Sequence, residues 1–309
     1  MALFTPSQSP AVVVKEVDAT GGVPNVQTST GAIVGNFRWG PAEQRILISN
    51  ETELVNTFGA PDTTNTIDFH NASYFLRYSN AMQTVRSIDS NATNAVSTTR
   101  ATGGTLIGAP GYNTPVIKNN ASFHANAIES DGHTFAARYP GDLGNSLRVS
   151  ICADSAAFSA WAYKSGFDAK PVHSTYDTAK NGLGTEIHLA VVDKHGLISG
   201  TKGTILEAYP YVSVASNSKN TDGTTNYVKD VVNERSEYIY MGKWDSDFSL
   251  AKAGDALPTD GVNVTYLDAA VLKGDSATKN YDFDSGVSPS SISVADYQTG
   301  YDLFDDVEA

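Results

Sequence analysis

The clearest hydrophobic pattern in the chain lies in residues 28–61. Residues 31–37 are small, apolar or β-branched, which is typical of a strand buried on both faces. Gly40-Pro41 interrupts this run, and residues 46–48 resume it as a second short strand. We therefore expect two strands that are joined by a tight Gly-Pro turn.

A short helix should follow the second strand. Asn50 is a good N-cap, and Glu53 is placed to accept a hydrogen bond from the Asn50 N–H. Gly59 supplies a left-handed stop, with Pro61 just beyond it. One apolar stripe runs along the predicted helix, formed by Leu54, Val55 and Phe58.

The next residues predict a second helix and a strand. Residues 84–88 have the composition of a strand. Helical spacing relates the apolar side chains before it, which are Phe69, Ala72, Phe75, Leu76 and Met82. Residues 28–92 therefore form the α/β part of a core, with helices that cover a sheet face.

Residues 1–27 form an extended N-terminal arm. A strong strand signal lies inside it, formed by Val12, Val13, Val14, Lys15, Glu16 and Val17. Gly21-Gly22 and Pro24 separate that strand from the core. A tethered strand can pair with an edge of its own sheet or with the edge of a neighbouring chain, and the residues alone favour its own sheet.

The middle of the chain changes character twice. Residues 93–132 are rich in Gly, Asn, Ser and Thr, which predicts a long surface connection or insertion and no core element. Residues 133–287 form a β-rich core domain. Strands are expected at 134–138, 146–152, 186–192, 203–208, 237–241 and 262–267, and a helix at Val228, Val231 and Val232.

Residues 288–309 predict one more helix. Ser293 and Asp296 have the spacing of a capping box. Val294, Tyr297, Tyr301 and Phe304 form an apolar stripe, and no sheet element follows it. This element is interpreted as the start of a truncated C-terminal α/β domain, and the chain as a fragment. The fold class is α+β: a mixed α/β and β-rich, sandwich-like core with an arm and a surface insertion.

Composition narrows the function classes. The formal net charge of −13 argues against a nucleic-acid partner, because no basic surplus exists to neutralise phosphates. Cys152 is the single cysteine, so an internal disulfide is excluded, and a buried apolar role is expected for it. No apolar run is long enough to cross a membrane, so no direct membrane insertion is expected.

Candidate catalytic and metal motifs are poorly represented. The chain has no Gly-x-Ser-x-Gly elbow, no phosphate-binding loop, no His-Glu-x-x-His and no paired Cys-x-x-Cys. Asp282-x-Asp284-x-Gly286 only begins like a calcium loop. The acids near the end of the chain fit a solvated surface: Asp302, Asp305, Asp306 and Glu308. We expect no catalytic residue, no metal and no cofactor. A β-rich surface binding or hydrolytic domain, suggested by 15 tyrosines and many carboxylates, is kept as an alternative.

Three stretches resemble the tail sheath proteins of contractile-tailed bacteriophages. The first joins residues 29–41, Ser-Thr-Gly-Ala-Ile-Val-Gly-Asn-Phe-Arg-Trp-Gly-Pro, to residues 49–59. The second, residues 138–147, is similar to that family's turn between two core strands. The third runs from Gly286 to Phe304 and is similar to the family's approach to its C-terminal domain.

The resemblance implies a structural subunit of the virion tail that is assembled in the host bacterial cytoplasm. Such subunits polymerise around the tail tube and contract to drive it through the host envelope, without a cofactor. Their partners are other sheath subunits, the tube, the baseplate and the tail terminator. In this family the arm adds a strand to a neighbouring subunit, which favours strand donation by residues 12–17. The receiving strands lie in the C-terminal domain that this chain lacks, so we expect the chain to fold without building tubes. The sheath of a related contractile injection system, a tailocin or a secretion apparatus, is the alternative.

Overall fold

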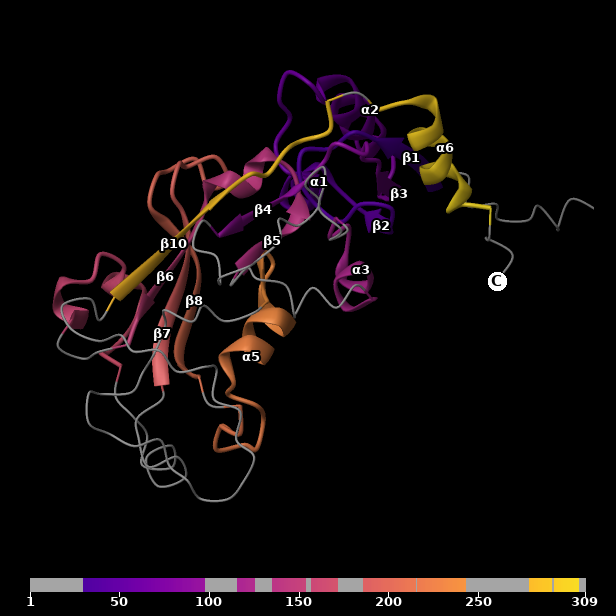
Figure 1. Ribbon diagram of the computed structural model, residues 1–309. Helices are drawn as coiled ribbons and strands as arrows, with labels where there is room; N and C mark the ends of the chain where they lie inside the picture. Colours follow the sequence, from indigo (N-terminus) through magenta and orange to yellow (C-terminus); the bar gives the residue numbers. More distant parts are fainter. Residues whose placement is uncertain are drawn as a thin grey trace, which may run out of the picture.

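The computed structural model describes residues 30–97, 116–125, 135–153, 157–171, 186–214, 216–242, 278–290 and 292–305. These residues build a small three-stranded sheet with helices beside it and a larger seven-stranded sheet (Figure 1). The α+β class is therefore confirmed. The arm at residues 1–27 and the strand signal at 262–267 lie outside the described residues.

The three-stranded sheet belongs to the first hydrophobic pattern of the chain. Its strands are β1 (Thr30–Gly35), β2 (Arg45–Ile48) and β3 (Ala81–Arg86), in the order β1-β3-β2. β1 runs parallel to β3, and β2 runs antiparallel to it. The helices of this part are α1 (Glu51–Phe58), α2 (Thr66–Leu76) and α6 (Val294–Asp302). The core between this sheet and its helices is a cluster of buried apolar side chains: Phe37, Ile48, Leu54, Phe58, Phe69, Ala72 and Met82.

The larger sheet is antiparallel, and its strand order is β8-β7-β6-β10-β4-β5-β9. Its strands are β4 (Asn94–Ser97), β5 (Phe135–Pro140), β6 (Leu147–Cys152), β7 (Glu186–Asp193), β8 (Thr204–Ser213), β9 (Ile239–Met241) and β10 (Thr278–Asp284). Helices α3 (Asn120–Ala125) and α5 (Val228–Arg235) accompany it, with short 3₁₀ turns η3 (Asp142–Ser146), η4 (Ala157–Ala160) and η5 (Lys164–Gly166).

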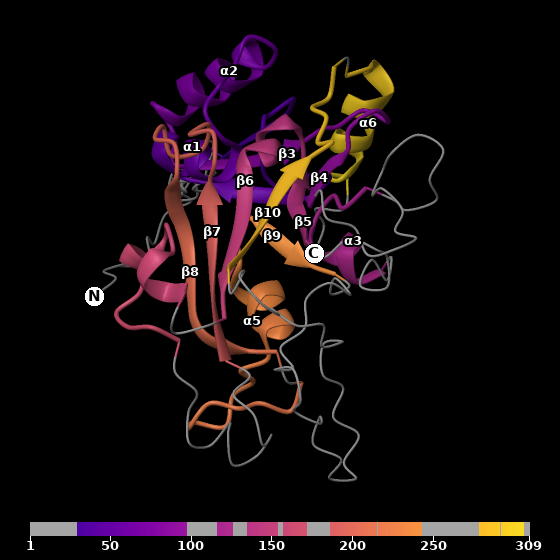
Figure 2. The ribbon, with the colours of Figure 1, turned by 60° about the vertical axis from the view of Figure 1, so that its left-hand side comes forward.

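This sheet curls strongly, as Figure 2 shows. β8 and β9 are its opposite edges, yet α5 contacts both of them. Val228, Val231 and Val232 of α5 are buried in the main core, as their helical spacing predicts. The sandwich-like arrangement expected for the β-rich part thus takes the form of one curled sheet whose hollow is filled by a helix.

Several local expectations are confirmed. Asn50 caps α1, where its side chain accepts from the Glu53 N–H at 2.9 Å. Ser293 and Asp296 form the predicted capping box of α6. β7 and β8 pair as an antiparallel hairpin, and Cys152 is buried.

Other expectations near β1 are wrong in detail. The Glu53 carboxylate accepts from the Ser49 N–H at 2.9 Å instead of the Asn50 N–H. Gly59 has φ 79° and ψ 164°, so its positive φ is not the left-handed helical conformation. Met82 lies in β3, not in the helix. β1 is fully buried only in its second half, because it is an edge strand whose first residues are covered on one side, where Phe75 lies against Gly31.

The expectation that residues 93–132 contribute no core element is wrong for the described part of that range. β4 lies inside the seven-stranded sheet between β10 and β5, and all four of its residues are buried. Phe123 of α3 is also fully buried and stacks on Tyr240, with ring centroids 4.0 Å apart.

The predicted apolar stripe of α6 is only partly covered by the described residues. Val294 is 84% exposed and Tyr301 is 51% exposed, whereas Gly300 is the buried residue of this helix. α6 packs closely on β1 through Gly300, where an added Cβ would lie 2.4 Å from a methyl group of Val34.

Candidate subunit-contact site

The only site residues that the sequence predicts are those of the arm strand, residues 12–17, and they lie outside the described residues. The structure does describe the root of the arm, which is β1 and the turn that follows it. The turn at residues 37–41 connects β1, a strand of the three-stranded sheet, to the seven-stranded sheet.

A buried arginine holds the turn in place. Arg86, at the end of β3, is fully buried. Its guanidinium donates to the carbonyl oxygens of Phe37 at 2.7 Å, Gly40 at 2.9 Å and Arg38 at 3.3 Å. The same group donates to Pro140 O of β5 at 2.7 Å. One side chain therefore ties the turn after β1 to the large sheet.

The charge of Arg86 has no directly paired carboxylate in the described part of the chain. Burial lowers the pKa of Arg86 to about 9, although Asp142 and Tyr139 act in the opposite direction. The group therefore stays cationic at neutral pH, and the four carbonyl dipoles take the place of a counter-ion.

Trp39 anchors the same turn from the other side. It is 5% exposed and belongs to the core of the seven-stranded sheet. Its ring meets Tyr139 edge to face, with centroids 5.4 Å apart. Gly40 makes the turn possible, since its φ is 94° and a Cβ there would lie 2.6 Å from Thr57 O.

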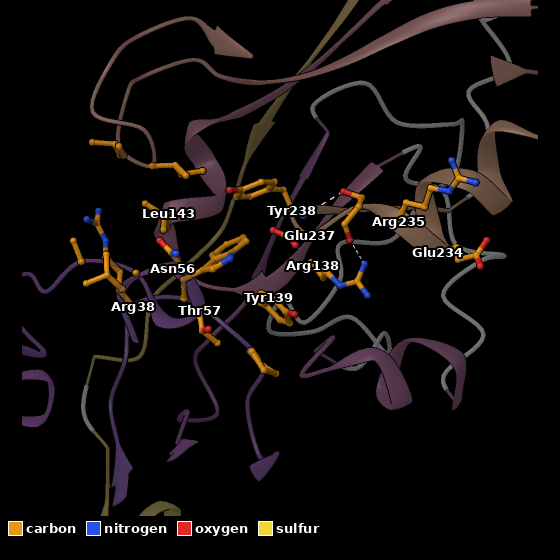
Figure 3. Close-up of a pocket in the computed structure, with 18 residues that line it drawn as sticks. Arg38, Asn56, Thr57, Arg138, Tyr139, Leu143, Glu234, Arg235, Glu237 and Tyr238 are labelled. Carbon is orange, nitrogen blue, oxygen red and sulfur yellow. Dashed lines mark hydrogen bonds between the residues drawn. The ribbon is translucent and has the colours of Figure 1, made fainter. Parts of the chain in front are cut away.

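A groove of about 740 Å³ opens beside this turn (Figure 3). Six segments contribute to its walls: the turn after β1, the end of α1, β5, η3, the loop after β7, and the end of α5 with its connection to β9. The charged side chains in the walls are Arg38, Arg138, Glu234, Arg235 and Glu237.

Two of the arginines at the groove, Arg38 and Arg138, interact with groups within the chain. Arg38 lies 3.6 Å from Asp62 and 3.7 Å from Asp142. Arg138 donates to Ser236 O, and its guanidinium lies 4.5 Å from the Tyr240 ring centroid. Neither arginine is therefore a free anion receptor.

A half-buried carboxyl group lies beside Ser236 and Glu237 at one end of the groove. Glu207 of β8 accepts from Ser236 Oγ and from the Glu237 N–H, both at 2.7 Å, and from Tyr209 Oη at 2.9 Å. Burial raises its pKa, against these hydrogen bonds. Because Ser236 and Glu237 lead into β9, Glu207 links the two edges of the curled sheet. The three hydrogen bonds give Glu207 a structural role. They do not point to the acid–base role that a hydrolytic site would need.

The loop after β7 presents an apolar side chain to the groove. Leu197 is 50% exposed. Asp193 holds this loop, because its carboxylate accepts from the N–H groups of Gly196, Leu197, Ile198 and Ser199 at 2.7–3.1 Å. Burial acts to raise the pKa of Asp193, but the hydrogen bonds from Ser146, Ser199 and Ile198 bring it below its ordinary value. A rigid loop with an exposed leucine suits a protein contact.

The described residues give little support for a metal site or for a membrane-spanning helix. They contain no group of three or more His, Cys, Asp and Glu residues that could hold a metal ion. Asp282, from the calcium-like sequence, lies in β10 and pairs instead with Arg148 and with Lys194, the latter at 3.0 Å. No helix in the described part has the length and apolar character that a bilayer crossing requires.

Comparison with known proteins gives partial matches. No model of a known protein family matches the sequence. The tail sheath protein of Salmonella phage ViI is 34% identical over 211 residues, which cover 66% of this chain and 29% of that protein. The tail sheath protein of Enterobacteria phage T4 is 35% identical over 125 residues, which cover 40% of this chain and 19% of that protein.

A solved sheath tail protein from Desulfitobacterium hafniense aligns with 97% of this chain and 43% of its own, with a TM-score of 0.42 at 9% identity. A TM-score of this size carries no argument, so the relationship rests on the sequence matches. Both sequence matches are to phage proteins that are named tail sheath proteins, and they show what the chain is similar to. It is homologous to phage tail sheath proteins, and the matched region spans less than a third of the length of these relatives.

Proposed function

We propose that this chain is part of a phage tail sheath subunit that polymerises around the tail tube and contracts to drive the tube through the host envelope. The observation that carries the proposal is the 34% identity over 211 residues to the Salmonella phage protein. The partners are other sheath subunits, the tail tube, the baseplate and the tail terminator. The sheath of a tailocin or secretion apparatus is second, because both sequence relatives described above are phage proteins.

Within this function, the arm strand is assigned to subunit–subunit contact. Val12, Val13, Val14, Lys15, Glu16 and Val17 would add a strand to the sheet of a neighbouring subunit. Support comes from the root of the arm: β1 begins at Thr30, and Arg86 and Trp39 fix the turn that follows it. A firm root is what a strand needs in order to transmit force between subunits.

The test replaces the gene in a phage that encodes this chain. Val13→Pro and Val14→Pro each remove one N–H group, and because successive groups point to opposite sides of a strand, one of the two must face the neighbour. We expect at least one variant to lose plaque formation and to show bare tail tubes by electron microscopy. Ser7→Pro, which lies outside the strand, is the matched control.

Wild-type sheaths in both proline variants would overturn the role of the arm. A separate measurement tests the sheath assignment itself. Antibodies against the chain should label purified tails along their whole length, and labelling confined to one end of the tail would contradict a sheath.

A further inference from the structure

The groove beside the turn after β1 contains apolar side chains that the described residues leave uncovered. Val55 of α1 is 36% exposed, and Leu197 in the loop after β7 is 50% exposed. Both line the groove, together with the half-buried Tyr238. Exposed apolar side chains that line one hollow from separate segments are typical of a surface that another polypeptide segment covers.

Both of these walls are held in place, so the groove exists before anything enters it. The loop that carries Leu197 is fixed by the Asp193 carboxylate, which accepts from four N–H groups. α1, which carries Val55, is fixed at its C-terminal end, where the Trp39 N–H donates to Phe58 O at 3.0 Å. A preformed groove needs little ordering of its own when a segment binds.

One end of the groove carries exposed charges of both signs. These are Glu234, Arg235 and Glu237, and Figure 3 shows Arg38 on the opposite side of the groove. Exposed carboxylates and an exposed guanidinium at one end can pair with a lysine or with a glutamate of an incoming segment. The groove is therefore suited to a segment that combines apolar residues with a charge.

The strand signal of the arm has this composition. Side chains alternate along a strand, so each face of residues 12–17 carries two valines and one charged residue, which is Lys15 on one face and Glu16 on the other. The valines match the apolar side chains of the groove, and either charge finds an opposite partner at its end. A short segment of such high β-propensity promotes aggregation when it is left uncovered, so cover before assembly is an advantage.

The connection between the arm strand and β1 is long enough for the strand to reach the groove of its own chain. Residues 18–29 form this connection, and a linker of that length has an r.m.s. span of about 20 Å. The groove begins at Arg38, and the path from Thr30 along β1 to Arg38 is at most about 26 Å. Because the local concentration is highest when the linker matches the span, even a weak contact would be populated.

We propose that residues 12–17 occupy the groove of their own chain before assembly and leave it when they add to the sheet of a neighbouring subunit. This inference rests on the proposed function, which assigns the arm to strand donation. The Glu237 N–H at the groove is already bound to Glu207, so the groove offers side-chain contacts in place of a main-chain ladder. Pairing with a neighbour's sheet supplies such a ladder, and the exchange therefore favours assembly.

Pairs of cysteines test the position of the arm in the 309-residue chain, whose own Cys152 is buried. Val13→Cys and Val14→Cys, one on each face of the strand, are each combined with Leu197→Cys in the groove. Leu47→Cys replaces Leu197→Cys in the control pairs. Leu47 is 54% exposed and lies in β2, in the same small sheet as β1, so undirected collisions of the arm reach it at least as often. At least one groove pair should form an intramolecular disulfide about fivefold faster than its control pair.

A second measurement needs no new cysteine. Lys15 is the single trypsin site in residues 1–27, so mass spectrometry of the cleaved chain reports how accessible the arm is. Leu197→Asp should speed cleavage after Lys15 by about fivefold, because a carboxylate among the apolar side chains opposes binding of the valines. Leu47→Asp should leave the cleavage rate unchanged.

Equal rates for the groove pairs and the control pairs would overturn the proposal, and so would cleavage after Lys15 that Leu197→Asp does not change. A disulfide-linked dimer whose yield rises with protein concentration would also overturn it, and would assign the groove to the arm of a second copy. Labelling of tails by antibody and plaque formation by the proline variants do not depend on the groove. Failure here is therefore distinguishable from failure of the proposed function.

Discussion

The two edges of the seven-stranded sheet are bridged by α5, and we call this sheet with its helices the closed part. The three-stranded sheet with its helices is the open part, because β1 has no second strand beside it among the described residues. In the larger sheet, α5 contacts both edges and Glu207 of β8 accepts hydrogen bonds from Ser236 and Glu237, which lead into β9. In the smaller sheet, the first half of β1 is only partly covered, and apolar side chains of α2 and α6 are exposed beside it. The seven-stranded sheet therefore has a core of its own, whereas the three-stranded sheet and its helices leave apolar surface exposed.

Several groups link the two parts, including Glu43 with Lys118, Ala42 with Asn119, and Arg38 with Asp142. Trp39 inserts into the core of the larger sheet, and Arg86 connects carbonyl groups of both parts. The turn at residues 37–41 is thus one link between the two parts, and removing the Arg86 hydrogen bonds should weaken it.

Substitution of Arg86 should have the largest effect. Arg86→Met keeps much of the side-chain volume but leaves four carbonyl oxygens without their donor. Loss of such a buried network costs about 3–5 kcal/mol of unfolding free energy. Urea denaturation, followed by far-UV circular dichroism, measures this loss.

Arg45→Met is the matched control for Arg86→Met. Arg45 lies in the same sheet, in β2, but it is exposed. Its substitution should change the unfolding free energy by less than about 0.5 kcal/mol. Equal effects of the two substitutions would show that Arg86 does not hold the two parts together.

A smaller effect is expected at the contact between α6 and β1. An alanine Cβ at position 300 would lie 2.4 Å from a Val34 methyl group, closer than real contacts allow. Gly300→Ala should therefore cost about 1–3 kcal/mol and expose α6 to limited proteolysis. Cleavage rate within α6 and the urea midpoint are the two measurements.

A second substitution tests the cause of that effect. Val34→Ala removes the methyl groups involved, so the double variant Val34→Ala/Gly300→Ala should recover part of the lost protection of α6. Gln298→Ala changes an exposed residue of the same helix and should leave proteolysis unchanged. A double variant as sensitive as Gly300→Ala would show that the close approach to Val34 is not the reason.

Local signals explain which elements the sequence predicts correctly. Asn50 and Ser293 mark helix starts through hydrogen bonds within a few residues, and the valines of α5 mark a buried face by spacing alone. β7 and β8 follow each other directly in the chain and form a hairpin. In each case the interactions that decide the structure lie within a short stretch of sequence.

Long-range pairing explains which elements and contacts cannot be predicted from the sequence. β4 is polar at Asn94, yet it is buried because the Asn94 side chain donates to Ile117 O and Ala137 O, both at 3.1 Å. β10 carries Lys279, Asn280 and Asp282 and still pairs with β6 and β4. Arg86 gives one faint signal, a charge inside a predicted strand, but its four carbonyl partners are 46–54 residues away. The groove and the open edge of β1 likewise depend on the strand order, which periodicity does not specify.

The smallest effect is expected from a fall in pH. It should lower the stability of the seven-stranded sheet, which contains His188. His188 of β7 is buried and stacks on Phe167, with ring centroids 4.6 Å apart. Its Nδ1 accepts from the Tyr211 N–H at 3.1 Å, and its Nε2 lies 2.9 Å from Ala169 O, to which it donates. This arrangement fits the neutral imidazole, and burial lowers the pKa of His188.

Because the pKa is lower in the folded state, the unfolded chain binds the proton first as pH falls. The stability that neutral His188 provides is complete above the unfolded pKa of about 6.5 and is lost as pH falls from there toward the folded pKa, by up to about 1.4 kcal/mol per pH unit. The urea midpoint of the wild type should therefore fall more between about pH 7.5 and about pH 5.5 than that of His188→Gln, which does not titrate. His70→Gln, on the exposed side of α2, should keep the wild-type response. If His188→Gln lost stability with acid as steeply as the wild type does, the closed part would owe its acid sensitivity to other groups.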